Sequence, residues 1–270
     1  MKKDLLSLLD LEKNDFDQLF TRALALKKRY ARGIFDKILT GKTLGLIFDK
    51  KSTRTRIAFE TAMIQLGGHP IYMSTQDTQI SRNEPAKDTA RVLSRYIDCL
   101  AMRTFDHSLV EAFARASAIP VINALTDSFH PCQILSDIMT VIEHKGGYKD
   151  VKIAWVGDGN NVANSWVNAA SVLGLHLVVA CPEGHMVKPG IIRAAGADTM
   201  DHIIFTSDPV EAVKNADVVY TDVWASMGEE EELAGRLAVF EGFQVNRDLL
   251  SHAGQDVLVM HCLQAHRGEE

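Results

Sequence analysis

Short apolar runs alternate along this chain with longer stretches in which apolar residues recur every three or four positions. The short runs are typical of buried strands, and the spaced stretches are typical of helices that bury one face. In the first half, the pattern predicts strands at 43–48, 69–73, 98–102 and 119–122 and helices at 15–30, 57–66, 86–97 and 107–117. Strands that alternate with helices favour a parallel sheet with right-handed crossovers.

A longer helix is predicted over 131–145, with Pro131 in its first turn and two glycines after its end. The alternation then restarts, with strands at 151–156, 175–180, 202–205, 217–220 and 256–260 and helices at 162–173, 188–195, 209–215 and 246–251. The chain is therefore predicted to be an α/β protein of two domains, 1–133 and 134–270. Each domain is expected to be a parallel sheet flanked by helices, and the long helix is expected to join them.

The composition is that of an ordinary globular protein, with 46% hydrophobic and 24% charged residues in a chain of 270. Its formal net charge of −6 argues against nucleic acid or an anionic membrane as a partner. Cys99, Cys132, Cys181 and Cys262 are widely separated, which suits a reducing compartment better than a disulfide framework. Because no apolar run reaches membrane-spanning length and the N-terminus lacks a signal-peptide pattern, we expect a soluble cytoplasmic protein.

The run Ser52-Thr53-Arg54-Thr55-Arg56 lies where a predicted strand gives way to a predicted helix. Free backbone N–H groups at a helix start attract anions, and arginine side chains add paired hydrogen-bond donors. A helix cap beside ordinary surface arginines is the simpler alternative. Three hydroxyls and two arginines within five residues favour an anion site instead.

Other candidate residues follow the predicted strands of the first half, at the sheet edge where ligands gather in such folds. Arg103 should project toward the same edge as the run at 52–56, although an arginine there is often only a solvated charge. His130 and Gln133 lie at the start of the long helix. A helix N-terminus lowers the pKa of a histidine, so that a neutral His130 could donate a hydrogen bond to a carbonyl oxygen. A purely structural histidine is the alternative.

In the second half, Gly157-Asp158-Gly159 resembles a dinucleotide-binding turn, but Val162 stands where the third glycine belongs. We favour an amide of Asn160 or Asn161 that contacts a small polar ligand. Asp222 follows a predicted strand and is suited to binding an ammonium group, and the segment 226–228 has the small, flexible character of a closing loop.

Cys262 ends the last predicted strand, and three interpretations remain open. It is a small buried hydrophobe, a nucleophile paired with His261, or a polar contact to substrate. A zinc site is disfavoured, because His261, Cys262 and His266 lack an accepted ligand spacing and a fourth ligand.

Taken together, these motifs resemble the aspartate/ornithine carbamoyltransferase superfamily over essentially the whole chain. The Ser-Thr-Arg-Thr-Arg run and His130-Pro-Cys-Gln133 mark the superfamily, and Met102-Arg103 adds to them. Ser226-Met-Gly228 within Asp222–Gly228, and His261-Cys-Leu263, favour the ornithine branch over the aspartate branch.

The resemblance implies a carbamoyl phosphate domain at 1–133, an ornithine domain at 134–270, and the following roles. For carbamoyl phosphate the residues are Ser52, Thr53, Arg54, Thr55, Gln79, Arg103, His130, Gln133, Cys262 and Leu263, with Gln79 supplied by a neighbouring subunit. For ornithine they are Asn161, Asp222, Ser226 and Met227. Arg103, His130 and Cys262 are the implied catalytic residues, with Cys262 and Leu263 at the reacting centre.

The implied reaction transfers the carbamoyl group of carbamoyl phosphate to the side-chain amine of ornithine, giving citrulline and phosphate in arginine metabolism. It needs no cofactor or metal, and the implied assembly is a homotrimer, or a multiple of trimers, with shared active sites. The alternatives are a carbamoyltransferase for putrescine or acetylornithine, and a non-catalytic metabolite-binding homologue. An NAD-dependent enzyme is a more distant alternative.

Two departures from the family pattern lie near the C-terminus. The family usually has a cis-proline after His-Cys-Leu, where this chain has Gln264. The family also continues past the position of Glu270 into a final helix, which the sequence given does not contain.

Overall fold

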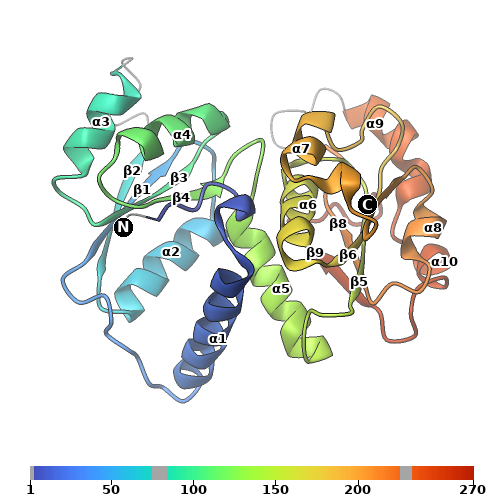
Figure 1. Ribbon diagram of the computed structural model, residues 1–270, viewed down its shortest axis with the longest axis horizontal. Helices are drawn as coiled ribbons and strands as arrows, with labels where there is room; N and C mark the ends of the chain where they lie inside the picture. The colour runs from blue at the N-terminus through green and yellow to red at the C-terminus, as the bar shows by residue number, and fades with distance from the viewer. Residues whose placement is uncertain (1–2, 75–83, 226–232) are drawn as a thin grey trace. The chain divides into compact units, whose positions relative to one another are not determined.

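The computed structural model describes residues 3–74, 84–225 and 233–270. The chain divides into two compact units, residues 1–135 and 136–270. The boundary falls inside helix α5 (Pro131–Lys145), the helix that the sequence predicts to join the two domains. Both units are built on parallel sheets (Figure 1), so the predicted α/β fold with two sheets flanked by helices is confirmed.

Unit 1 contains a four-stranded parallel sheet in the order β2-β1-β3-β4. Its strands are β1 (Thr43–Phe48), β2 (His69–Ser74), β3 (Cys99–Arg103) and β4 (Val121–Leu125). Its helices are η1 (Leu8–Asp10), α1 (Lys13–Tyr30), α2 (Arg54–Gln65), α3 (Ala86–Leu93) and α4 (His107–Ala116). The β4 strand begins one residue after Pro120, later than predicted, because proline has no N–H to donate to a ladder.

Alternate residues of β1 pack on opposite faces of this sheet, as the strand period of two requires. Leu44, Leu46 and Phe48 join a cluster with Met63 of α2, whereas Ile47 packs with α3 and α4. Helix α2 therefore covers one face, and α3 and α4 cover the other (Figure 1). With both faces covered, functional side chains can reach solvent only at the ends of the strands.

Unit 2 contains a five-stranded parallel sheet in the order β7-β6-β5-β8-β9. The strands are β5 (Lys152–Val156), β6 (His176–Ala180), β7 (Ile203–Thr206), β8 (Val218–Thr221) and β9 (Leu258–His261). The helices are α6 (Asn161–Leu173), α7 (Pro189–Ala194), η4 (Ala197–Thr199), α8 (Pro209–Val213), α9 (Leu233–Phe240), η6 (Glu241–Phe243) and α10 (Arg247–Leu250). Helix α9 was not predicted from the sequence.

The two faces of the second sheet are also covered. Trp155 of β5 stacks on Tyr220 of β8, and Trp166 of α6 meets the same ring edge-on. On the opposite face, Phe240 of α9 joins the buried cluster formed by α8, α10 and the strands. All four cysteines carry free thiols. Within the three described segments, none of the helices combines the length and the apolar character that a membrane crossing requires.

Candidate active site

In unit 1, the segments that follow β1, β3 and β4 are held together at the carboxyl ends of these strands. The N–H of Asp49 donates to the carbonyl of Arg103 (2.8 Å), and the N–H of Thr104 donates to that of Leu125 (3.1 Å). Parallel strands present their carboxyl ends at one edge, where α/β proteins bind ligands. The residues after all three strands therefore share one edge.

Arg103, Thr55 and His130 converge at this edge. The Arg103 side chain is 7% exposed, and its Nη1 lies 3.4 Å from Oγ1 of Thr55. His130 is also buried, directly before α5. Burial lowers the pKa of His130 to about 3, with a further contribution from the positive charge of Arg103. The ring is therefore neutral at physiological pH, as the sequence predicts, with burial as the main cause and the charge of Arg103 as a second.

The start of α2 supplies backbone donors to the same edge. Thr53 precedes the helix, and its side chain makes no capping hydrogen bond among the described residues. Ser52 and Thr55 are half-buried, whereas Thr53 and Arg54 are exposed. Uncapped N–H groups and the helix dipole give this terminus a partial positive charge. The local chemistry is therefore suited to an anion.

The two arginines of the run differ in their surroundings. Arg56 forms an ion pair with Glu60 (Nε to Oε1, 2.8 Å) and stacks over Tyr72, with its guanidinium carbon 3.5 Å from the ring centroid. Arg56 is thus committed to contacts along α2 and β2. Arg54 is the arginine of the run that remains suited to an incoming anion.

Lys50 also lies at this edge, although the sequence analysis assigned it no role. Its side chain is buried, forms an ion pair with Asp127, and lies over the ring of Phe105 with Nζ 4.3 Å from the centroid. The pair connects the turn before Ser52 with the turn before His130. Its position directly after a strand, two residues before the run, was the available signal.

Two glutamines, Gln133 and Gln79, are the remaining residues that the sequence predicts for the unit 1 group. Gln133 lies in the first turn of α5, half-buried, and its N–H donates to the His130 carbonyl (3.1 Å). Gln79 lies outside the described residues.

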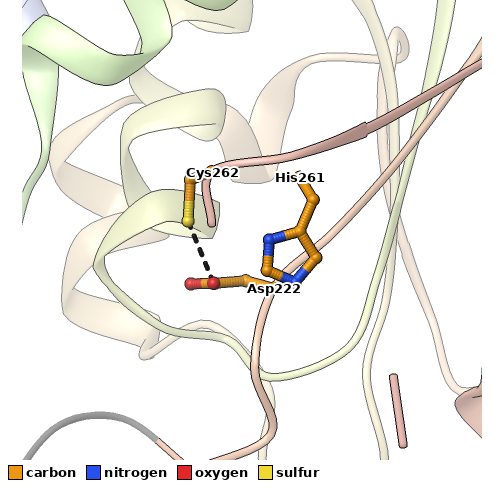
Figure 2. A group of neighbouring side chains, drawn as sticks. All are labelled: Asp222, His261 and Cys262. Carbon is orange, nitrogen blue, oxygen red and sulfur yellow. Dashed lines mark hydrogen bonds between the residues drawn. The ribbon is translucent and has the colours of Figure 1, made fainter. Parts of the chain in front are cut away.

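In unit 2, Asp222 is the centre of a second polar group, at the carboxyl ends of β8 and β9. Its Oδ2 accepts a hydrogen bond from Nδ2 of Asn160 (2.8 Å), and its Oδ1 accepts one from the Cys262 thiol (2.9 Å). Figure 2 shows this thiol–carboxylate contact, with His261 beside it. Asn160 also caps α6 by accepting from the N–H groups of Val162 and Ala163. One asparagine thus fixes both the helix start and the carboxylate.

The electrostatics of this pair keep the thiol protonated. Burial raises the pKa of Cys262, and the neighbouring Asp222 carboxylate raises it further. Burial also raises the pKa of Asp222, against the lowering effect of hydrogen bonds from Cys262, the Val223 backbone and Asn160. Because a thiolate is the nucleophilic form of cysteine, these surroundings favour a polar contact over the nucleophile that the sequence left open.

The remaining predicted residues of unit 2 are placed as follows. Asn161 is the first residue of α6 and half-buried, and the amide of its neighbour Asn160 donates to Asp222. Leu263 is exposed, and the Leu263–Gln264 peptide bond is cis, as in the family pattern although proline is replaced. Ser226 and Met227 lie outside the described residues.

Arg236 of α9 is a second residue that the sequence analysis missed. Its buried side chain donates from Nε to the carbonyl of Trp224 (2.5 Å) and pairs through Nη2 with Asp158 (2.9 Å). These contacts hold the segment after Asp222 against the turn before α6. No pattern in the sequence indicated them, because α9 itself was not predicted.

The Gly157–Asn161 turn has a packing explanation that needs no dinucleotide. A Cβ atom added at Gly159 would lie 2.5 Å from the carbonyl carbon of Met186 and 2.7 Å from the carbonyl oxygen of His185. The N–H of Gly159 donates to that same oxygen (2.8 Å). Glycine is required here because two backbones meet.

Asp222, His261 and Cys262 also have the donor types of a metal site, with their ligand atoms within 4.8 Å of one another. In this structure those atoms are engaged in hydrogen bonds, and a protonated thiol is a poor metal ligand. The arrangement is thus suited to holding a small polar or cationic group through the carboxylate.

Comparison with known proteins identifies related sequences over the whole chain. Residues 3–143 match the family model described as the carbamoyl phosphate-binding domain of aspartate/ornithine carbamoyltransferase. Residues 149–270 match the model of the corresponding aspartate/ornithine-binding domain. Each of the two units thus corresponds to a different substrate domain of one family.

Individual relatives agree with these matches. The chain is 54% identical over 270 residues to an ornithine carbamoyltransferase of Syntrophus aciditrophicus, covering 100% of this chain and 89% of the relative. It is 50% identical over 270 residues to one from Geobacter sulfurreducens, with the same coverage. The solved structure from Pyrococcus furiosus is 48% identical, with a TM-score of 0.93, over 99% of this chain and 86% of that one.

Proposed function

The chain belongs to the aspartate/ornithine carbamoyltransferase family, and we propose that its two polar groups divide the work of one reaction between them. That reaction transfers a carbamoyl group from carbamoyl phosphate to ornithine and gives citrulline, a step of arginine biosynthesis. The observation that carries the proposal is the convergence of Arg103, Thr55 and His130 at the edge that also holds the start of α2.

In this proposal, the unit 1 group binds carbamoyl phosphate. The N–H groups and hydroxyls of Ser52–Thr55, with the Arg54 guanidinium, hold the phosphate, and Gln133 and Gln79 complete the site. Arg103, Thr55 and the neutral ring of His130 donate hydrogen bonds to the carbonyl oxygen. Support comes from the burial of Arg103 and His130, since donors in a site of low dielectric stabilise developing charge most strongly.

The unit 2 group is proposed to bind ornithine, with Asp222 holding its side-chain amine and Asn161, Ser226 and Met227 contributing further contacts. An alkyl ammonium has a pKa of about 10.4, so the amine must lose a proton before it can attack. The buried carboxylate of Asp222, with its raised pKa, supports a role in easing that proton away. Cys262 and Leu263 then lie beside the reacting carbon.

The chemical step is an attack of the neutral amine on the carbonyl carbon of carbamoyl phosphate. The new C–N bond gives a tetrahedral oxyanion, which the Arg103, His130 and Thr55 donors stabilise. Collapse of this intermediate breaks the C–O bond to phosphate, and the electron pair leaves with the phosphate. The ammonium loses its first proton to Asp222 before the attack, and the nitrogen loses a second proton to the departing phosphate after the C–N bond has formed, so charge and atoms balance without a cofactor.

The two arginines of the run provide a matched test of the phosphate assignment. We expect Arg54→Ala to weaken carbamoyl phosphate binding at least tenfold in calorimetry, because charge-assisted contacts contribute about 1.5–3 kcal/mol. Arg56→Ala, which removes a guanidinium held by Glu60 and Tyr72, should leave the affinity within about threefold. Equal affinities for both variants and the wild-type chain would contradict the assignment.

We further propose that the enzyme is a homo-oligomer, a trimer or a multiple of trimers with shared active sites, in the cytoplasm. The exposed apolar side chains of unit 1 support assembly, since Ile57 and Ile64 of α2 and Ile71 of β2 are 56%, 60% and 46% exposed. Four free thiols support a reducing compartment.

A further inference from the structure

We propose that His107 is a positioning residue for the reaction, which holds the turn of residues 126–129 and thereby sets the place of His130. The inference rests on the proposed function, because His130 matters here as a donor to the carbonyl oxygen of carbamoyl phosphate. The sequence motifs assigned His107 no role. Both histidines belong to unit 1.

The four residues before His130 form a closed turn. The backbone N–H of Thr126 donates to the carbonyl of Phe129 (2.9 Å), and the N–H of Phe129 donates to the Thr126 hydroxyl (3.2 Å). Thr126 directly follows β4, and Phe129 directly precedes His130. The turn therefore connects a strand of the sheet to His130, and the Thr126 hydroxyl is one of the contacts that set its shape.

His107 contacts both ends of this turn. Nδ1 of its ring lies 3.1 Å from Oγ1 of Thr126, and the ring meets that of Phe129 edge-on, with the centroids 5.0 Å apart. Edge-to-face contacts between aromatic rings are favourable. One side chain from α4 thus bridges the first and the last residue of the turn.

The hydrogen bonds of the Thr126 hydroxyl fix the direction of its contact with His107. Oγ1 accepts from the N–H of Phe129 and from Nδ2 of Asn123 (3.4 Å), which leaves its single proton to donate. Nδ1 of His107 is 3.1 Å from this oxygen, and the carbonyl of Phe129 is 3.5 Å from it. The hydroxyl proton therefore lies in the shorter bond, and the neutral ring carries its own proton on Nε2.

The surroundings of His107 keep the ring neutral. Its side chain is 15% exposed, and burial lowers its pKa below the ordinary value of 6.5. The carboxylates of Glu111, Asp10 and Asp106 act in the raising direction but do not outweigh burial. Nδ1 is therefore free of a proton at physiological pH and can accept from the hydroxyl, while Nε2 lies 4.0 Å from Oε1 of Glu111.

The start of α4 is attached to the same turn through the backbone. The carbonyl of Phe105 accepts a hydrogen bond from the N–H of Asp127 (3.0 Å). The Asp106 side chain caps the helix by accepting from the N–H of Ser108 (2.8 Å). Because a capped first turn is held in place, His107 meets the turn from a fixed support.

This arrangement predicts a loss of turnover without a matching loss of carbamoyl phosphate binding. The phosphate contacts proposed for Ser52–Thr55 come from α2 and the residues before it, not from the turn at 126–129. The bond proposed for His130 goes to the carbonyl oxygen, where charge develops during the attack. A displacement of about 1 Å there can cost about a hundredfold in rate. A merely structural residue would change binding and turnover together.

Two substitutions of His107 separate the hydrogen bond from the ring contact. In His107→Asn, the side-chain oxygen takes the place of Nδ1 and accepts from Thr126. In His107→Phe, the ring still packs on Phe129 but offers no acceptor. We expect citrulline kcat to fall less than about fivefold in His107→Asn and more than about twentyfold in His107→Phe. The Kd for carbamoyl phosphate in calorimetry should stay within about threefold of the wild-type value in both.

Thr126 supplies the second arm and keeps the test decisive if a His107 variant fails to fold. Thr126→Val removes the hydroxyl and should lower kcat about twentyfold, whereas Thr126→Ser keeps it and should stay within about fivefold. The double variant of His107→Phe with Thr126→Val should lose little more than either single one, because both remove the same contact. His252→Asn, at an exposed histidine after α10, is the control and should leave kcat unchanged. Thermal melting of each variant establishes that it is folded.

Equal kcat losses in His107→Asn and His107→Phe, or a loss of carbamoyl phosphate affinity in proportion to kcat, would overturn the positioning role. Losses that multiply in the double variant would do the same, since they would come from independent contacts. A wild-type chain that forms no citrulline in the same assay would instead overturn the proposed function. The two failures are therefore distinguishable.

Discussion

At the scale of single residues, His130 shows how the surroundings of a side chain set its protonation state. Its pKa of about 3 means that the folded protein keeps the ring neutral, while the unfolded chain protonates it near pH 6.5. A folded pKa below the unfolded one gives stability that is complete above pH 6.5 and is lost as the pH falls toward 3. Keeping the His130 ring neutral in the folded protein therefore makes the fold less stable in acid.

The lowered pKa of His130 in the folded protein leads to a stability prediction for His130→Asn. Between pH 7 and pH 5, the free energy of unfolding of the wild-type chain should fall by about 2 kcal/mol more than that of the variant, because each pH unit contributes about 1.4 kcal/mol. Urea denaturation at the two pH values measures both. Parallel losses in the two proteins would mean that His130 is not the buried neutral group described here.

The sequence anticipated that some of these residues would lie together, but not how residues of one type would differ in their contacts. The convergence of Arg103 and Thr55 followed from their places after parallel strands. The difference between Arg54 and Arg56 did not, because it depends on Glu60 and Tyr72. Nor could the sequence show that the Cys262 thiol donates to Asp222, since that requires the register of β8 and β9.

At the scale of elements, the turns after the strands carry the proposed site, and close packing restricts the residues of one of them. The Gly157–Asn161 turn passes so near the backbone of 185–187 that a side chain at Gly159 has no room. The same turn presents Asn160 to Asp222. A glycine pattern that resembles a dinucleotide motif is thus explained by two backbones in contact.

We therefore expect Gly159→Ala to destabilise the protein by about 1–3 kcal/mol, as overpacking does, and to weaken ornithine binding through Asn160. The matched control is Gly190→Ala in α7, where an added methyl group meets no atom within 4 Å. That change should be neutral or stabilising by up to about 1 kcal/mol, because alanine favours helix. Equal melting temperatures for the two variants would argue against the packing explanation.

Most elements were predictable because apolar periodicity is strong in buried strands and in helices that cover them. The exceptions have physical causes. Helix α9 has only two turns, and six of its eight residues are hydrophobic, so its polar residues are too few to define a helical period. The predicted helix at 86–97 ends at Leu93, where Ser94 bonds back to the Ala90 carbonyl with both its N–H and its hydroxyl.

At the scale of the whole molecule, the two polar groups lie in different units. The Arg103 group belongs to residues 1–135, and the Asp222 group to residues 136–270. This division matches the two family domains, one for each substrate. Two units that bind different substrates explain why the sequence has two alternations of strand and helix rather than one.

The proposed assembly has its own test at this scale. The proposal expects the purified chain to sediment as a trimer or a multiple of it, and the exposed isoleucines on α2 and β2 are the candidate contact surface. Replacing Ile64 with Glu should shift the population toward monomer, because a charge would be buried without a partner. Sedimentation at the mass of one chain at micromolar concentration would contradict the assembly.

The central claim, that a buried cationic group drives transfer of a carbamoyl group to ornithine, is tested most directly by citrulline formation. Arg103→Met removes the charge and keeps most of the buried stem. The wild-type chain should form citrulline from carbamoyl phosphate and ornithine, and the variant should lose at least a hundredfold in kcat/KM. A wild-type chain without citrulline formation, or an Arg103→Met variant with full activity, would contradict the account.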